Sequence, residues 1–473
     1  MKQKTESASY AADFLLIKLP PNVADGIFDV DSEGKVSIDL TNWSLAGFLF
    51  HEWIHYLHNV STLNGVYAFA SMINMWANFR HKLDRSGKSV EANTLSEYAE
   101  SSVRRTHAYR KKAARYERNM ASALRESTNS LKIRTVEAIT EDLPQLLGHQ
   151  VERVSVLNCE TEGSSDEALI CFEVGPVEIL EGIAFMLEEK FLMIRGQLPT
   201  NVKTAPYKLL QSIARHVVCD IEDDCVIGAA LTALQTDDPP LTLLTILRDL
   251  SKKADNERMA WLENLSREYL TAYGSLIDGA LDQTIQLFPV TEPMGEAVKD
   301  VARIIRQNIK WRQETPFLEL LMLQRLRSEN EEILRERLLY VMASYSCARI
   351  LARAPRGAPS ATLDQVYHIG APSTSPHLLF GAQKLHSALH FLWLHLSDDG
   401  FVATESISAS KERKCCPFYA ACDYQLRRDR PDLCADRPWE SLAIETDPAN
   451  ECWYRAGVRA TRLPEGDFDE DSR

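Results

Sequence analysis

The segment from Phe48 to His58 constrains this chain more than any other, because an apolar run there contains the pattern His51-Glu52-x-x-His55. Its composition suits an α-helix, in which residues four positions apart lie on the same face. The two imidazoles would then lie side by side, with the Glu52 carboxylate at the flank of that face. Apolar residues gather on the opposite face of such a helix, at Leu49, Trp53, Tyr56, Leu57 and Val60. The pattern therefore predicts an amphipathic helix. Its apolar face would pack in a core, and its opposite face would present the two histidines.

Two histidines placed in this way can bind one metal ion, and a neighbouring carboxylate can take a proton from a water molecule held there. Residues 44–62, which carry the pattern, resemble the active-site helix of the zincin metallopeptidases. The resemblance implies that His51 and His55 bind a catalytic zinc ion and that Glu52 is the general base. The alternative interpretation is a pair of buried histidines that are hydrogen-bonded within a helical core.

The residues after the second histidine distinguish between zincin subclasses. The metzincin extension requires glycine at position 58 and histidine at position 61, whereas this chain has His58 and Ser61. His58 would follow on the same face as His51, but three ligands on successive turns of one straight helix converge poorly on a tetrahedral ion. We therefore expect His58 to support the site or face the substrate, with a ligand role as the alternative.

The gluzincin subclass, which the chain then resembles, takes its third ligand from a glutamate on a later helix. Glu181 lies within the largely apolar segment 177–187, and a lone buried carboxylate is costly unless it is paired or bound to a metal. Gly182 and Ala184 beside it would let another helix come close. We expect Glu181 to be the third zinc ligand and Glu178 to be the reserve. Without a metal, Glu181 would face solvent or pair with a basic residue.

Zincins stabilise the oxyanion with a donor from outside the motif helix, and the resemblance makes Tyr207 and His216 candidates for that role. His216 also starts a group of side chains of the types that bind metals: His216, Cys219, Asp220, Glu222, Asp223, Asp224 and Cys225. Acidic residues are common near helix starts because they interact favourably with the helix dipole. The group is therefore only a weak indication of a further metal contribution.

A second possible metal site lies near the C-terminus, where Cys415, Cys416, Cys422 and Cys434 fall within twenty residues and Cys452 stands apart. Four cysteines can converge on one metal centre in a small module with many loops. The spacing leaves three alternatives open: a structural zinc ion, an iron–sulfur cluster, or thiols without a ligand. Nearby arginines form a basic patch that suits an acidic partner, at Arg427, Arg428, Arg430 and Arg437.

Composition limits the functional classes. The 473 residues carry a formal net charge of -14, which argues against wholesale binding to nucleic acid or an anionic membrane. The chain has no apolar run of about 18 residues that could span a bilayer, and its polar start does not predict a signal peptide. Ten cysteines without such a leader indicate a reducing compartment. We therefore expect a cytoplasmic protein that does not bind membranes.

The predicted fold class is α+β and predominantly α-helical, with a small β-sheet next to the motif helix and a long helical region. Residues 10–235 are predicted to form the catalytic region, with a helical insertion at about 88–150 whose basic strip, 104–118, could dock a partner. Residues 236–356 are predicted to be a helical scaffold. Residues 376–473 would contain a helix, the cysteine module and a disordered acidic tail. The predicted strands comprise 13–19, 35–40, 151–156 and 168–174, and a linker is expected at 354–376.

These features together predict a zinc-dependent hydrolase, most simply an intracellular metallopeptidase that cleaves specific protein targets. The alternative is an interaction protein without catalytic activity, in which the motif helix and the cysteine cluster are structural metal sites. In that alternative, the basic strip 104–118 or the C-terminal module would bind a protein or nucleic acid.

Overall fold

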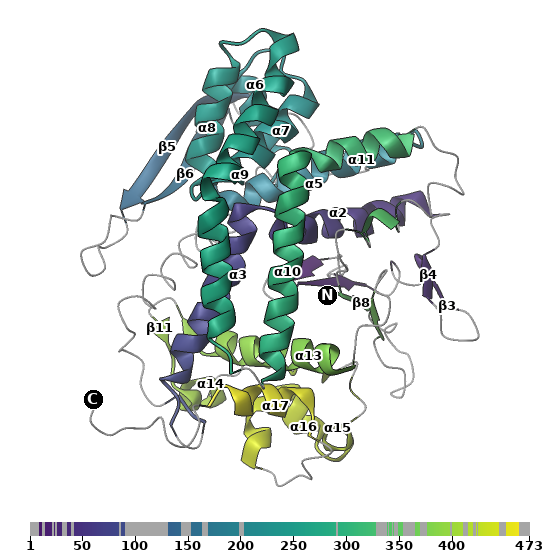
Figure 1. Ribbon diagram of the computed structural model, residues 1–473, viewed down its shortest axis with the longest axis vertical. Coiled ribbons are helices and arrows are strands. Elements are labelled where there is room, and N and C mark those ends of the chain that lie inside the picture. The colour runs from purple at the N-terminus through teal and green to yellow at the C-terminus, as the bar shows by residue number, and fades with distance from the viewer. Residues whose placement is uncertain are drawn as a thin grey trace.

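The computed structural model describes the greater part of the chain (Figure 1). The described residues are 9–11, 15–20, 23, 26–30, 36–38, 42–84, 87–89, 131–142, 153–162, 169–197, 203–289, 292–327, 338, 340–342, 344, 349–352, 365–368, 376–397, 400–409, 415–419, 422, 424–443 and 451–462. The basic strip 104–118 and the acidic tail lie outside this part of the chain.

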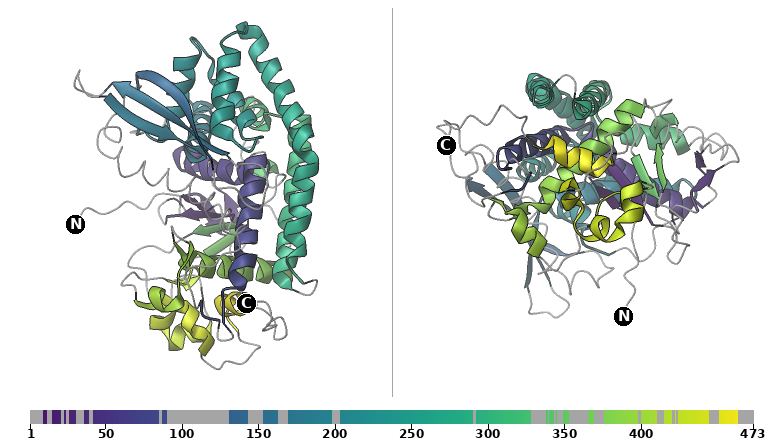
Figure 2. Two further views of the ribbon diagram at one scale, coloured as in Figure 1. Left: turned by 90° about the vertical axis from the view of Figure 1, so that its left-hand side faces the viewer. Right: turned by 90° about the horizontal axis from the view of Figure 1, so that it is seen from below.

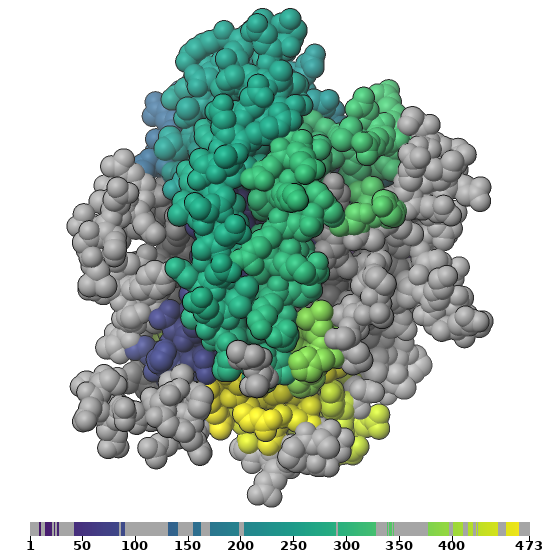
Figure 3. Space-filling view, viewed as in Figure 1, coloured from purple at the N-terminus to yellow at the C-terminus, as the bar shows by residue number. Residues whose placement is uncertain are grey.

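Long helices form the body of the molecule. The motif helix α2 (Trp43–Asn59) is followed directly by α3 (Leu63–Arg80), and α5 (Pro176–Met193) packs across α2. Two further helices, α9 (Asp255–Gln286) and α10 (Pro293–Glu314), run side by side along the long axis and cover much of the face shown in Figure 3.

The remaining helices complete the two ends of the body. At one end are α6 (Leu209–Val217), α7 (Asp223–Ala233), α8 (Pro239–Leu250) and α11 (Leu318–Arg327). At the other end are α13 (Pro376–Leu394), α14 (Thr404–Ala409), α15 (Gln425–Asp429), α16 (Pro431–Asp436), the 3-10 helix η3 (Pro438–Ala443) and α17 (Trp453–Ala460). None of the helices in the described part of the chain combines the length and apolarity needed to cross a bilayer.

Two sheets accompany the helices. The first has the order β1-β2-β8-β9, formed by Ser9–Ala11, Leu16–Leu19, Arg349–Ala352 and Gln365–His368, and only its β2–β8 pair is parallel. The second is the antiparallel meander of β5 (Ile133–Asp142), β6 (Arg153–Glu162) and β7 (Leu169–Val174), seen on one side of the molecule in Figure 2. Two further pairs join β3 (Phe28–Val30) to β4 (Val36–Ile38), and β10 (Leu396–Ser397) to β11 (Gly400–Phe401).

The main hydrophobic core extends from Ile17 to Met342 without a break at the predicted boundary near residue 235. Residues of α8 and α9 therefore contribute to the same cluster as residues of α2, α5 and α7. A second cluster lies between the later part of α3 and the C-terminal helices, and includes Trp76, Phe79, Leu389 and Tyr454. Trp76 Nε1 donates to Thr461 Oγ1 at 3.1 Å, which ties α3 to the end of α17.

The structure confirms the α+β, predominantly helical class, and it contains strands within or overlapping each of the four predicted strand segments. Two predictions were wrong. The expected helical insertion is wrong at residues 133–142, because they pair with β6 as strand β5. The helical region ends before Arg349, and the expected linker contains β9, because β8 pairs with β2 and β9 pairs with β8. The β2–β8 pair joins segments that are far apart in the sequence, so local periodicity carries little trace of it.

Candidate metal centre

Packing against α5 fixes the motif helix. Asn42 caps α2 by accepting a hydrogen bond from the backbone of Leu45. The rings of Trp43 and Phe50 stack on Phe191 of α5, with centroid separations of 4.2 and 4.5 Å. Gly47 lets the helices approach closely, since a Cβ atom there would lie 3.0 Å from a side-chain carbon of Leu192. These contacts fix the position of α2 relative to α5. A metal site that takes ligands from both helices needs this fixed position.

Helix α5 begins where Gly175-Pro176 predicts it, with proline in its first turn. Glu178 accepts a hydrogen bond from the backbone N–H of Gly175 at 2.8 Å, so this carboxylate caps the helix. Glu178, the reserve ligand, is therefore used elsewhere. Gly182 allows the close helix approach that was expected of it, because a Cβ there would lie 2.5 Å from Cβ of Leu210 on α6.

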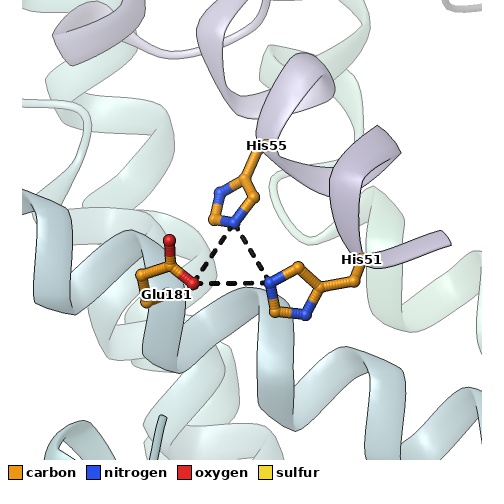
Figure 4. A group of neighbouring side chains, drawn as sticks. All are labelled: His51, His55 and Glu181. Atoms are coloured by element: carbon orange, nitrogen blue, oxygen red, sulfur yellow. Dashed lines mark hydrogen bonds and ion pairs between the residues drawn. The ribbon is translucent and has the colours of Figure 1, made fainter. Parts of the chain in front are cut away.

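His51, His55 and Glu181 converge from α2 and α5 (Figure 4). The Nε2 atoms of the two histidines lie 3.2 Å apart, and Oε2 of Glu181 lies 3.4 Å from Nε2 of His51 and 3.5 Å from Nε2 of His55. Tetrahedral zinc, with bonds of about 2.0–2.2 Å to nitrogen and oxygen, holds its ligand atoms about 3.3–3.6 Å apart. The three side chains thus fit three corners of a tetrahedral ion. The Glu181 side chain is 28% exposed, so the group is not wholly enclosed by protein.

Glu188 is a functional residue that the sequence reasoning missed. It lies two turns after Glu181 on α5, and its Oε2 accepts a hydrogen bond from Nδ1 of His51 at 2.9 Å. A carboxylate on Nδ1 fixes the ring orientation and leaves Nε2 free to bind a metal. The spacing of seven residues between the two glutamates, which brings them to one helix face, is the signal that could have found it.

The charges at the site are strongly coupled. Burial alone would lower the pKa of His51, but the hydrogen bonds to Glu181 and Glu188 raise it to about 10. Burial alone would raise the pKa of Glu181. His51 and His55 outweigh burial and hold this pKa well below its usual range. Two carboxylates around a histidine pair therefore give this site an excess of negative charge that a cation would neutralise.

Glu52 lies beside the three converging residues and is not one of them. It is buried, and burial raises the pKa of its carboxyl above the usual value, against the opposing influence of His51 and His55. A carboxylate with a raised pKa is better matched to proton transfer near neutral pH. Its position next to the ligands, without joining them, is the one expected of a general base.

Two tyrosines border the site. The Tyr207 ring lies edge-on to His51 at a centroid separation of 5.9 Å, and burial together with Glu181, Glu52 and Glu188 raises the pKa of its hydroxyl. This hydroxyl therefore stays protonated and can donate a hydrogen bond. Tyr10, on strand β1, stacks on His55 at 6.3 Å with an interplanar angle of 12°, and its hydroxyl accepts a hydrogen bond from Asn59. The sequence analysis did not single out Tyr10, because it lies 45 residues before His55.

His58 and His216 lie away from the site. His58 is fully buried, its Nε2 lies 3.3 Å from Oε1 of Glu319, and it is not part of the group formed by His51, His55 and Glu181. Arg312 donates two hydrogen bonds to Glu319, at 2.6 and 3.2 Å, and binds Ser61 as well. His58 thus belongs to a buried ionic network that joins the end of α2 to α10 and α11.

His216 is exposed, and neither it nor its acidic neighbours belong to the metal-type group of the described residues.

Comparisons with protein-family models, with curated proteins and with solved structures find no match to this chain.

Proposed function

We propose that the protein is a zinc-dependent hydrolase that cleaves peptide bonds. The observation that supports this most directly is the ligand geometry: His51, His55 and Glu181 stand at the mutual distances of three tetrahedral zinc ligands. Hydrolytic zinc sites use three protein ligands and leave one position for water or substrate, whereas structural sites use four. A bound zinc would supply Lewis acidity and lower the pKa of a water molecule there.

The residues of the chain would divide the remaining work. Glu52 would take the proton from the attacking water and pass it to the leaving amine. Tyr207 would donate a hydrogen bond to the oxygen that becomes negatively charged as the carbonyl is attacked. Glu188 would hold the His51 ring in its binding orientation. Zinc binding needs a neutral His51 ring, so the proton that the surrounding carboxylates hold on His51 would leave as the metal binds.

A peptide substrate is favoured by strand β1. It is an edge strand of the four-stranded sheet among the described residues, and it holds Tyr10 against His55. An extended peptide can add to such an edge by main-chain hydrogen bonds, and it would then pass beside the metal ligands. We place this activity in the cytoplasm, since the described cysteines are free thiols, which a reducing compartment preserves.

The test is cleavage of a mixed peptide library, read by mass spectrometry, together with zinc content in the same samples. We expect about one zinc at the histidine site of the wild type and cleavage of a subset of peptides. Glu52→Gln should keep the zinc and slow cleavage by about 10²–10⁴-fold, the usual contribution of a general base. Glu263→Gln on the exposed side of α9 is the matched control and should cleave normally. A wild-type protein with its zinc in place and no cleavage of any peptide would favour the non-catalytic interaction protein instead.

A further inference from the structure

A second group of side chains gathers at the opposite end of the molecule from α6 and α8. Cys416, Cys422, Cys434 and Cys452 line one pocket. They come from the loop before α15, from α16, and from the residue before α17. Their spacing is C-x5-C-x11-C-x17-C. Three of them belong to the set of four predicted above; Cys452 lines the pocket, and Cys415 does not.

Backbone contacts hold the four cysteines around the pocket. The N–H of Cys416 donates to the carbonyl of Cys434 at 2.9 Å, which joins the loop to α16. Arg427 donates to the carbonyl of Cys422 at 2.8 Å. The sulfur of Cys452 accepts a hydrogen bond from the backbone N–H of Arg455 at 3.5 Å, so this sulfur lies at the start of α17. Four thiols from three segments are thereby held at one place although the helices between them are short.

The distances between the sulfurs indicate what the pocket would hold. A single tetrahedral zinc, with Zn–S bonds of about 2.3 Å, would bring four sulfurs to about 3.8 Å from one another. Within the described residues, His51, His55 and Glu181 form a group with ligand atoms all within 4.8 Å of one another, and the cysteine sulfurs form no such group. No three of the four sulfurs therefore lie within 4.8 Å of one another, which is a wider arrangement than one tetrahedral zinc holds. A cluster that places several iron and sulfide atoms between the thiolates needs a wider arrangement of this kind.

The rest of the pocket suits a polarisable, sulfur-rich group. Its walls include the aromatic residues Phe418, Trp453 and Tyr454, and Cys422 is 8% exposed. Arg427 also lines the pocket, and its guanidinium lies over the ring of Tyr419 at 4.9 Å. A cluster bound by four thiolates carries net negative charge, which a nearby arginine offsets. The same wall contacts α13, because His390 lies 3.2 Å from the Tyr454 hydroxyl and the Phe418 ring packs on His386.

We propose that Cys416, Cys422, Cys434 and Cys452 bind an iron–sulfur cluster that joins the three C-terminal segments and fastens them to α13. Binding replaces four S–H bonds by four Fe–S bonds and releases four protons. This site does not depend on the hydrolase proposal, because it shares no residue with the zinc ligands.

The experiment is anaerobic reconstitution of the full chain with ferric iron, a dithiol reductant and sulfide, followed by measurement of iron, acid-labile sulfide, zinc and visible absorption. We expect iron and sulfide in equal amounts, at about two or four of each per chain, and a broad visible band that dithionite bleaches. One zinc bound by the cysteines in place of iron and sulfide would overturn the proposal, and so would failure to bind either metal.

Variants identify the ligands. Cys452→Ala and Cys434→Ala should each lose most of the iron and sulfide, whereas Cys415→Ala, the matched control next to Cys416, should retain both. Loss in Cys415→Ala with retention in Cys452→Ala would overturn the assignment. His51→Ala should leave the iron content unchanged, which keeps the two metal sites distinguishable. Circular dichroism of each variant separates loss of a ligand from loss of the whole fold. The iron and sulfide content of the wild type tests the proposal even if a variant fails to fold.

Discussion

The Oε2 atom of Glu188 accepts a hydrogen bond from Nδ1 of His51 at 2.9 Å, from a position two helical turns beyond Glu181. One helix, α5, therefore supplies both a ligand-type carboxylate and the group that orients the facing histidine. A shift or rotation of α5 would disturb both contacts together. This relationship explains why the packing of α2 on α5, through Gly47 and Phe191, matters for the chemistry of the site.

Glu188→Ala should weaken zinc binding by about 10–100-fold, the usual cost of losing a carboxylate that orients a metal-bound histidine. Glu188→Gln should weaken it less, since the amide oxygen can still accept the Nδ1 proton. Zinc titration against a competing chelator measures both. Glu189→Ala, the adjacent and half-buried carboxylate, is the control. Equal zinc affinity in Glu188→Ala and wild type would contradict the orienting role.

Glu181 and Glu178 should respond in opposite ways to the same substitution. Glu181→Ala removes one of three ligands and should lower zinc affinity and hydrolysis together. Glu178→Ala removes the cap on Gly175 and should cost about 1 kcal/mol of stability, with zinc binding unchanged. Zinc titration and denaturant unfolding of the two variants test the pair. If Glu178→Ala lost zinc and Glu181→Ala kept it, the ligand assignment would be reversed.

The buried network around Arg312 should be sensitive to the loss of one partner. Arg312 and Glu319 are both fully buried, and Arg312 holds the pKa of Glu319 at about 2 against the effect of burial. Glu319→Ala leaves a buried guanidinium without its carboxylate, so it should destabilise the protein by about 3–5 kcal/mol. The double variant Arg312→Met/Glu319→Leu should lose less than the single one. Urea unfolding provides the measurement, and a loss of under about 1 kcal/mol in Glu319→Ala would contradict the expectation.

His395 should give the C-terminal region a pH-dependent stability. Burial lowers the pKa of His395 to about 4, although its hydrogen bond to the carbonyl of Phe391 opposes this. Its Nε2 faces the hydroxyl of Thr404 at 2.9 Å, which suits a neutral ring. The pKa of His395 is therefore about 6.5 in the unfolded chain and about 4 in the folded chain. Stability is therefore complete above pH 6.5 and falls as the pH drops toward 4, by up to about 3 kcal/mol.

Unfolding midpoints between pH 7 and 4 test this expectation. His395→Phe should flatten the slope in that window, whereas His377→Phe, at an exposed position of α13, which ends just before His395, should leave it as in wild type. An unchanged slope in His395→Phe would show that other groups are responsible.

The sequence by itself determined the features that depend on local periodicity. The same-face geometry of His51 and His55 follows from the pitch of one helix, and the start of α5 follows from Gly175-Pro176. The predominance of helix was also predicted, because turn residues and apolar periodicity are properties of short segments.

Only the tertiary structure decided how distant segments meet. Glu181 is 126 residues from His55, and helical periodicity does not distinguish it from Glu178 until α5 packs on α2. Glu188, Tyr10 and Cys452 reached their sites through long-range contacts in the same way. The pairing of β2 with β8 joins residues more than 300 positions apart. Such contacts depend on the packing of whole elements, whereas local pattern reports only the face that each element turns toward a core.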